Sequence, residues 1–221
     1  MPFAVRHRSD PTPPIAPLPG LAVAREECAA AMAALQGRTE EEMRRRFDAG
    51  HRAYVARLHD APAAWGWVAT RTADIGELGS SFAVPDGERY LWNFVTLPSH
   101  RGLGIYPRLL DAIVRGESRG AAAAERFWIA YAPENHASGA GIRKAGFVAL
   151  AELSFDAAGR AALRGLTPGG GRIASRVLGL PEAADPLAQC WRCVRAGRGA
   201  MSCAPDRCRC DYQQPASGCA A

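Results

Sequence analysis

The stretch from residue 89 to residue 114 constrains the fold most, because it joins a strand pattern to a helix pattern through a glycine-containing turn. Residues 89–97 are dense in aromatic and β-branched residues, which is typical of a buried strand. Pro98 then ends the strand, because proline has no N–H to donate to a neighbour. From Ile105 onward, apolar residues recur at helical spacing. The chain is therefore predicted to combine strands and helices around this turn.

The turn itself has the composition of an anion-binding site. Gly102 and Gly104 let the backbone approach a ligand closely, and the start of the helix offers unpaired N–H groups. Arg101 adds a cation at the same place, so the turn suits a pyrophosphate group. The glycines alone also fit an ordinary strand-to-helix turn, since the usual phosphate-binding motifs are absent. The sequence around the turn separates these two interpretations.

That surrounding sequence resembles the GNAT superfamily of acetyl-coenzyme A-dependent N-acyltransferases. Residues 98–106 are similar to the family motif Arg/Gln-x-x-Gly-x-Gly/Ala with its preceding proline, and residues 135–147 are similar to the segment Asn-x-x-Ser/Ala…Lys-x-Gly-Phe. The resemblance covers roughly residues 1–155. The matching residues are Pro98, Arg101, Gly102, Gly104, Asn135, Ser138, Lys144, Gly146 and Phe147, whereas Tyr106 replaces the last small residue of the first motif.

The resemblance implies an α/β (α+β) fold in which helices flank a mixed, mostly antiparallel sheet of about 6–7 strands. Residues 1–180 would form this N-acetyltransferase domain, and residues 181–221 would form a Cys- and Arg-rich tail. The strands at about 89–97 and 126–132 should splay apart at their C-terminal ends. That opening would hold the pantetheine arm of acetyl-CoA, the implied co-substrate.

The resemblance also implies which residues bind the coenzyme. The end of the central strand should pair with the pantetheine arm, and a backbone N–H near Leu97 should polarise the thioester carbonyl. The glycine turn should hold the pyrophosphate. Asn135 should contact the arm and cap the next helix, and a cap alone is the open alternative. The predicted coenzyme-binding residues are Val95, Thr96, Leu97, Arg101, Gly102, Leu103, Gly104, Ile105, Tyr106 and Asn135.

The catalytic residues depart from the family pattern. Many relatives carry a tyrosine as general acid seven residues after the asparagine, where this chain has Ile142. Many also carry a glutamate general base on the central strand, where this chain has Tyr90. The candidate catalytic residues are therefore Tyr90, Tyr131 and Ser138, with Tyr106 as a further substitute for the acid and Glu77 and Glu88 as the nearest carboxylates. Both glutamates are more typical of solvated turns.

Four aromatic residues on neighbouring strands have two possible roles. They either line an acceptor site or pack in the core: Trp65, Trp67, Tyr90 and Trp92.

Two functions stay open at this point. The first is an enzyme that transfers an acetyl (acyl) group from acetyl-CoA directly to a small-molecule or peptide amine. The second is an acyl-CoA-binding or metal- or redox-responsive regulatory protein with little catalysis. A monomer and a homodimer both fit the sequence.

Composition sets the expected compartment and excludes some partners. The chain has 221 residues, of which 48% are hydrophobic, and no apolar run approaches the length of a membrane helix. Its first residues lack the apolar region of a signal peptide, so we expect a cytoplasmic protein without a membrane partner. The net charge of +5 comes from residues 160–221, which hold nine arginines and four acidic residues. We do not expect a nucleic-acid partner, because these arginines form no recognisable binding module.

The tail contains six of the seven cysteines, between Cys190 and Cys219. Clustered cysteines in a cytosolic chain favour a metal over disulfides, and the spacing suits a tetrahedral zinc site. The predicted ligands are Cys190, Cys193, Cys203 and Cys208, and redox-active or free thiols are the alternative.

Local patterns predict the remaining elements. Helices are expected at 25–35, 39–49 and 156–166, and a last strand is expected at 172–178. The segment Asp10–Gly20 holds five prolines and is predicted to be a stiff, extended connection near the acceptor site.

Overall fold

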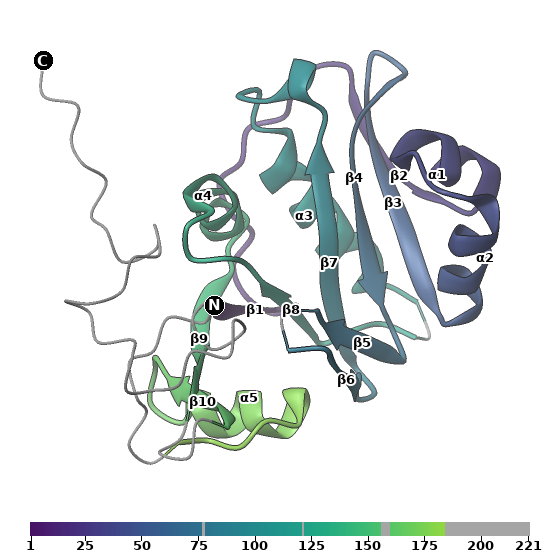
Figure 1. Cartoon of the computed structure of the whole chain (residues 1–221). Helices are drawn as coiled ribbons and strands as arrows, with labels where there is room; N and C mark the ends of the chain where they lie inside the picture. The colour runs from purple at the N-terminus through teal and green to yellow at the C-terminus, as the bar shows by residue number, and fades with distance from the viewer. Residues whose placement is uncertain (77, 121, 156–159, 184–221) are drawn as a thin grey trace, which may run out of the picture.

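The computed structural model describes residues 1–76, 78–120, 122–155 and 160–183. Within these residues the chain forms an eight-stranded sheet in the order β10-β9-β1-β8-β7-β4-β3-β2, together with a two-stranded hairpin of β5 and β6 (Figure 1). The predicted tail beyond residue 183, with its four proposed metal ligands Cys190, Cys193, Cys203 and Cys208, lies outside the described residues, and so does Glu77. The zinc site therefore stays a prediction.

The elements have the following bounds. The strands of the large sheet are β1 (Pro2–His7), β2 (Leu21–Glu26), β3 (His51–Leu58), β4 (Ala61–Ala69), β7 (Glu88–Thr96), β8 (Arg126–Ala130), β9 (Val148–Phe155) and β10 (Ala161–Gly165). The hairpin strands are β5 (Thr72–Ile75) and β6 (Ser80–Ala83). The helices are α1 (Ala29–Gln36), α2 (Glu40–Asp48), the short 3₁₀ helix η1 (Pro98–His100), α3 (Ile105–Glu117), α4 (His136–Lys144) and α5 (Gly170–Leu178).

The sheet confirms the predicted fold class. Neighbouring strands of the sheet run antiparallel, except that β7 and β8 run parallel. The sheet has eight strands where about 6–7 were predicted, and one source of the difference is β2. A helix was predicted from Arg25, but Arg25 and Glu26 pair with Tyr54 and Ala53 at the edge of the sheet, and the helix begins at Ala29.

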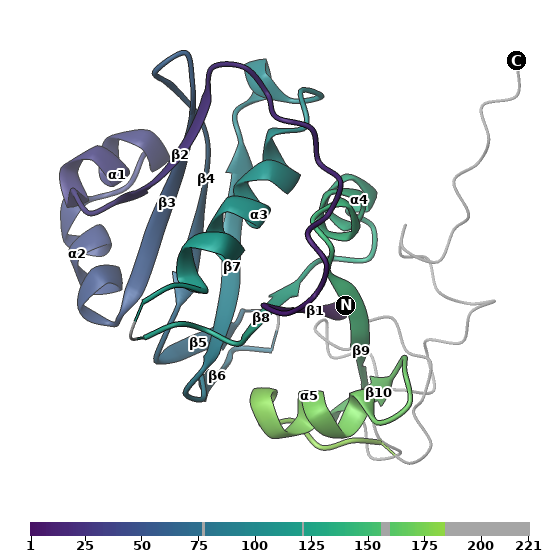
Figure 2. The same cartoon turned by 180° about the vertical axis from the view of Figure 1, so that it is seen from behind.

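Helices cover both faces of the sheet. Figure 2 shows α3 in front of β4 and β7, where its buried residues, such as Leu109, Leu110 and Ile113, pack into the largest core cluster. On the other face, α1 and α2 bury Met32 and Met43 against Trp67 and its neighbours. Within the described part of the chain, no helix is long and apolar enough to cross a membrane.

The end of the domain differs from the local prediction. Residues 161–165 form β10, which pairs with β9, although alanines there favoured a helix. Residues 170–178 form α5, although a strand was predicted from residue 172. Gly169 and Gly179 flank this helix with left-handed backbone, and its buried residues Ala174, Val177 and Leu178 have helical spacing. Pairing with β9 outweighs the helix preference of the alanines in β10, and the capping glycines outweigh the strand preference of residues 172–178.

Candidate functional site

The parallel strands β7 and β8 separate at a defined point. They pair from Glu88 to Leu91 on β7, and Leu91, opposite Ile129, is the last partner. Two residues later Asn93 has a φ of +52°, and the pairing of β7 with β4 shifts register at the same level. Such a bulge bends a strand, and asparagine tolerates positive φ better than most residues. The remainder of β7 therefore diverges from β8, which gives the predicted opening.

The glycine turn lies at the end of this diverging strand. After η1, Gly102 and Gly104 have φ of +80° and +68°, and Gly104 is the N-cap of α3. Among the described residues, no backbone hydrogen bond outside helices and strands starts at the N–H of residues 102–106. These donors and the positive end of the α3 dipole lie beside Arg101, which is exposed. The turn thus has the unpaired donors that an anion-binding site requires.

A cavity of about 650 Å³ connects the strand opening with this turn. Its walls come from the end of β7, the glycine turn, the start of α3 and one face of α4. It brings together nine of the predicted residues: Val95, Thr96, Arg101, Gly102, Gly104, Ile105, Tyr106, Asn135 and Ser138. It also includes Phe94, His100, Pro107, Ala137, Ala140, Gly141 and Lys144, which we did not predict to line it. The cavity-lining residues of α4 share one face of the helix, because they are spaced three or four residues apart: Ala137, Ala140, Gly141 and Lys144. This helical spacing in the sequence could have identified them as lining residues.

Leu97 and Leu103 do not line this cavity. The side chain of Leu103 is 46% exposed, and the N–H of Leu97 donates to the carbonyl of Ala63 at 2.9 Å. The N–H of Leu97 itself is therefore occupied, and the predicted donor near Leu97 would have to be the N–H of a neighbouring residue. Because N–H groups alternate in direction along a strand, that of Thr96 points away from β4, towards the opening. The Thr96 carbonyl supports this direction, since it accepts a hydrogen bond from Nε of Arg101 at 3.3 Å.

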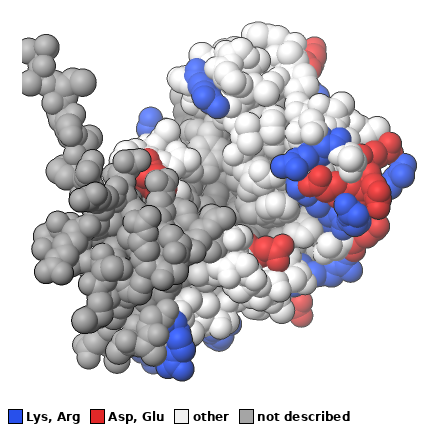
Figure 3. Space-filling view, viewed as in Figure 1, with Lys and Arg blue, Asp and Glu red and all other residues white. Residues whose placement is uncertain are grey.

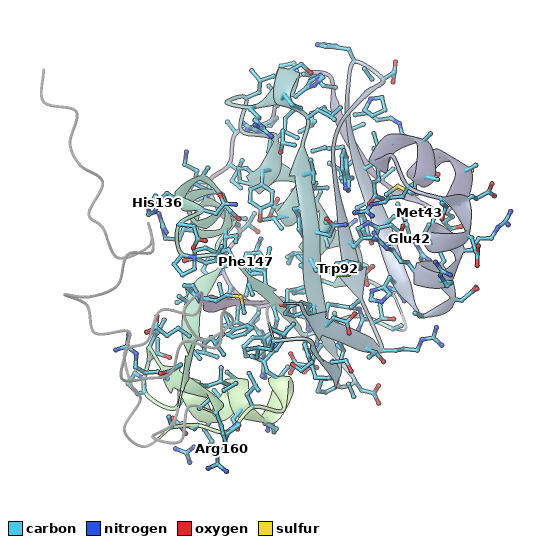
Figure 4. The ribbon with its side chains drawn as sticks, in the orientation of Figure 1. Glu42, Met43, Trp92, His136, Phe147 and Arg160 are labelled. Carbon is cyan, nitrogen blue, oxygen red and sulfur yellow. The ribbon has the colours of Figure 1, made fainter. Side chains whose placement is uncertain are left out.

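Asn135 caps α4 and also faces the cavity. Its Oδ1 accepts a hydrogen bond from the N–H of Ser138 at 3.0 Å, which confirms the predicted cap. Its neighbour His136 is exposed, does not line the cavity and lies on the outer side of α4 (Figure 4).

Two hydroxyl groups meet between α3 and α4. The hydroxyl of Tyr106 lies 3.4 Å from Oγ of Ser138, and both residues line the cavity. The Tyr106 ring packs against Phe94 and against Gly141, where a Cβ would lie only 2.4 Å from the ring. Burial raises the pKa of Tyr106 to about 12, although the bond to Ser138 acts in the opposite direction. Tyr106, the large residue at the last position of the first family motif, thus fits because α4 carries Gly141 opposite its ring.

The other candidate tyrosines lie elsewhere. Tyr131 packs against Gly139, and its side chain does not line the cavity. Tyr90 is buried beside Phe82, with ring centroids 5.3 Å apart, in the cluster formed with β6 and α5. The structure therefore brings Ser138 to the cavity but not Tyr90 or Tyr131.

No carboxylate lines the cavity among the described residues. Glu88, predicted to be solvated, is instead buried, where it accepts a hydrogen bond from Trp128 at 2.7 Å and pairs with Arg126 at 3.2 Å. His51 is also unsuited to act as a base. Its Nδ1 accepts a hydrogen bond from Trp92 at 3.2 Å, which leaves the ring proton of the neutral form on Nε2, and burial lowers its pKa.

The tryptophans form a packed unit rather than an open aromatic wall. The guanidinium of Arg46 lies 5.1 Å and 5.0 Å from the ring centres of Trp67 and Trp92, and Arg46 also pairs with Glu42. Figure 4 places Glu42 on α2 and Trp92 on β7. Figure 3 shows acidic and basic side chains intermixed over α2, whereas the surface around β7 is mostly uncharged. The Trp67–Trp92 pair thus fixes α2 to the sheet.

Solved structures with a similar fold include several acetyltransferases. A GCN5-related N-acetyltransferase from Kribbella flavida is 19% identical over 67% of this chain and 53% of its own, with a TM-score of 0.43. A GNAT-family acetyltransferase from Streptococcus pneumoniae is 16% identical over 61% of this chain and 89% of its own, with a TM-score of 0.45. The ribosomal-protein-S18-alanine N-acetyltransferase from Escherichia coli is 18% identical over 64% of this chain and 88% of its own, with a TM-score of 0.45.

The chain thus spans about half the length of the first of these proteins. No protein-family model matches the chain, and no curated protein matches it. The first two of these proteins are named as members of the superfamily that the sequence resembles.

Proposed function

We propose that this protein is a GNAT-type acyltransferase that transfers an acetyl group from acetyl-CoA to an amine in a ternary complex. The observation that carries the proposal is the single cavity joining the diverging end of β7 to the unpaired N–H groups of the glycine turn. An extended thioester arm suits the strand end, and a pyrophosphate suits the turn. An acyl-CoA is one ligand that has both parts, and the cavity joins the two features.

The reaction requires two proton movements. The amine nitrogen attacks the thioester carbonyl carbon, the C–S bond breaks, and the coenzyme leaves as a thiolate that takes up a proton while the nitrogen loses one. The N–H of Thr96 is our candidate donor to the carbonyl oxygen during the attack. With no carboxylate among the described lining residues, the amine would enter neutral, and after the attack its nitrogen would pass the proton that it loses to water.

Tyr106 is our candidate donor to the leaving sulfur. Tyr106 lines the cavity, its hydroxyl lies beside Ser138 in the first turn of α4, and its raised pKa keeps it protonated at neutral pH. A free thiol has a pKa of about 8.5, so the tyrosine would stabilise the thiolate by a hydrogen bond rather than by complete proton transfer.

Tyr106→Phe should therefore lower kcat by about tenfold or more and leave the affinity for acetyl-CoA unchanged, because phenylalanine keeps the packing against Gly141 and Phe94. Steady-state kinetics and calorimetry measure the two quantities. Tyr131→Phe is the matched control, since Tyr131 does not line the cavity, and it should leave kcat unchanged. An unchanged kcat in Tyr106→Phe, or an equal loss of kcat in the control, would reject this role.

Thiol release with a panel of amines tests the proposal as a whole. An acyltransferase releases free coenzyme A in proportion to the acceptor that is acetylated. The buried Ile142 and the lack of a carboxylate in the described cavity wall favour a second candidate, an acyl-CoA-binding protein without efficient turnover. Binding without acceptor-dependent thiol release would support that second candidate.

A further inference from the structure

The cavity beside β7 has an inner end at Phe94. Along β7, the described residues that line it are Phe94, Val95 and Thr96. Because the pairing of β7 with β8 ends at Leu91, Phe94 is the lining residue of this strand closest to the point at which the two strands separate. The pyrophosphate and the acyl group are at opposite ends of the pantetheine arm of an acyl-CoA. A donor with its pyrophosphate at the glycine turn therefore directs its acyl group towards Phe94.

The ring of Phe94 lies in a space that a glycine provides. Gly66 on β4 is buried, and a Cβ added to it would overlap the Phe94 ring. The register between β4 and β7 shifts between Trp65 and Trp67, so Gly66 lies at an irregularity of the sheet. A glycine inside a strand often marks such a close approach of another group. The position of the Phe94 ring thus depends on the absence of a side chain at residue 66.

A second aromatic ring supports the first. The rings of Phe94 and Tyr106 have centroids 5.5 Å apart, and both pack against the largest core cluster. The Tyr106 ring in turn contacts α4, where a Cβ on Gly141 would overlap it. Protein interiors are close-packed, so neither ring can recede without displacing its neighbours. The two rings therefore form a fixed, apolar wall of the cavity.

We propose that this wall sets the length of the acyl group, so that the cavity admits acetyl and excludes butanoyl and longer chains. Phe94 lies two residues, or about 7 Å along the strand, before Thr96, whose N–H is our candidate donor to the thioester carbonyl. The acyl chain beyond that carbonyl thus meets the Phe94 ring. The inference rests on the proposed function, because it specifies which acyl group the same donor carries.

Calorimetry with acetyl-CoA and butanoyl-CoA tests the inference without knowledge of the acceptor. The wild-type protein should bind acetyl-CoA about tenfold more tightly, because two additional methylene groups would have to enter space that the ring occupies. Phe94→Ala should remove this preference. It should strengthen butanoyl-CoA binding about tenfold and change the affinity for acetyl-CoA less than about threefold.

Gly66→Ala should have the opposite effect on the cavity. The added methyl group would displace the Phe94 ring towards the bound donor, and acetyl-CoA binding should weaken about tenfold. The double variant Gly66→Ala/Phe94→Ala should recover the lost affinity, because it lacks the ring that the methyl group displaces. If the single variant does not fold, the folded double variant still tests the wall, since it should bind both donors equally. A folded double variant that binds neither donor, or that keeps the wild-type preference, would contradict the inference.

Phe47→Ala is the matched control. It removes a half-buried phenyl ring from α2, where Phe47 packs on Trp67 with ring centroids 5.4 Å apart and does not line the cavity. This variant should keep the preference for acetyl-CoA. Equal binding of the two donors by the wild-type protein, or an unchanged preference in Phe94→Ala, would overturn the inference and leave the proposed function intact. Failure of folded wild-type protein to bind acetyl-CoA would instead overturn the proposed function, and this inference with it.

Discussion

Replacing Gly104 with glutamate should weaken acetyl-CoA binding more than about a hundredfold while the protein remains folded. Gly104 caps α3 with a φ of +68°, and it lines the cavity beside the unpaired N–H groups of the turn. A carboxylate there would repel the pyrophosphate and occupy the space in which the backbone approaches it. A Cβ at this position would also lie 2.5 Å from Nη1 of Arg108, so the Arg108 contact to the turn would have to move.

Two control variants separate the causes of the loss. Gly104→Ala introduces the positive-φ strain, of about 1–2 kcal/mol, without the charge, and it should retain part of the affinity. Gly37→Glu adds the same residue at a glycine with a φ of +62° and open space around it, distant in sequence from the turn. It should bind acetyl-CoA normally. Calorimetry measures the affinities of the three variants for acetyl-CoA, and circular dichroism checks that each variant is folded. Normal binding of acetyl-CoA by Gly104→Glu would show that the turn does not hold the coenzyme.

Replacing Glu117 with glutamine should lower the free energy of unfolding by about 3 kcal/mol, because it leaves the buried Arg89 and the partly buried Arg52 without this counter-charge. Glu117 ends α3 and is only 4% exposed. Its carboxylate accepts hydrogen bonds from Arg52 at 2.5 Å, Arg89 at 3.0 Å and Tyr54 at 2.7 Å. These partners belong to β3 and β7, so the cluster fixes the C-terminal end of α3 to the sheet.

The measurement is urea unfolding of the purified variants, compared at equal m-values. The matched control is Glu40→Gln, which removes a carboxylate from an exposed pair with Arg44 on α2. Exposed pairs of this kind contribute about 0.3–0.5 kcal/mol, so the control should change stability little. Equal effects of the two substitutions would contradict the importance assigned to the buried cluster.

The sequence was sufficient to predict the parts of the site that depend on local chemistry. Pro98, the glycines at 102 and 104, and the cap at Asn135 act through their own backbone and nearest neighbours, and these are properties that residue type determines. The strand, turn and helix around them were therefore placed correctly. Thr39 illustrates the same point, since its side chain accepts a hydrogen bond from Glu42 as the capping pattern predicts.

The parts that were missed depend on contacts between distant residues. β1 lies between β8 and β9, so the proline-rich connection that follows it runs along α3, where Arg108 donates a hydrogen bond to the carbonyl of Ala16. The occupied N–H of Leu97 follows from its pairing with Ala63, and the burial of Glu88 follows from its contact with Trp128. No local pattern encodes these pairings, because a strand of suitable composition fits several positions in a sheet.

Titration of acetyl-CoA into the purified protein, followed by calorimetry, is the most direct test of the central claim. The account predicts saturable binding close to one site per chain, with affinity that falls as salt screens the phosphates. Absence of binding by a folded sample would contradict it, and the turn from Arg101 to Tyr106 would then be an ordinary connection between a strand and a helix.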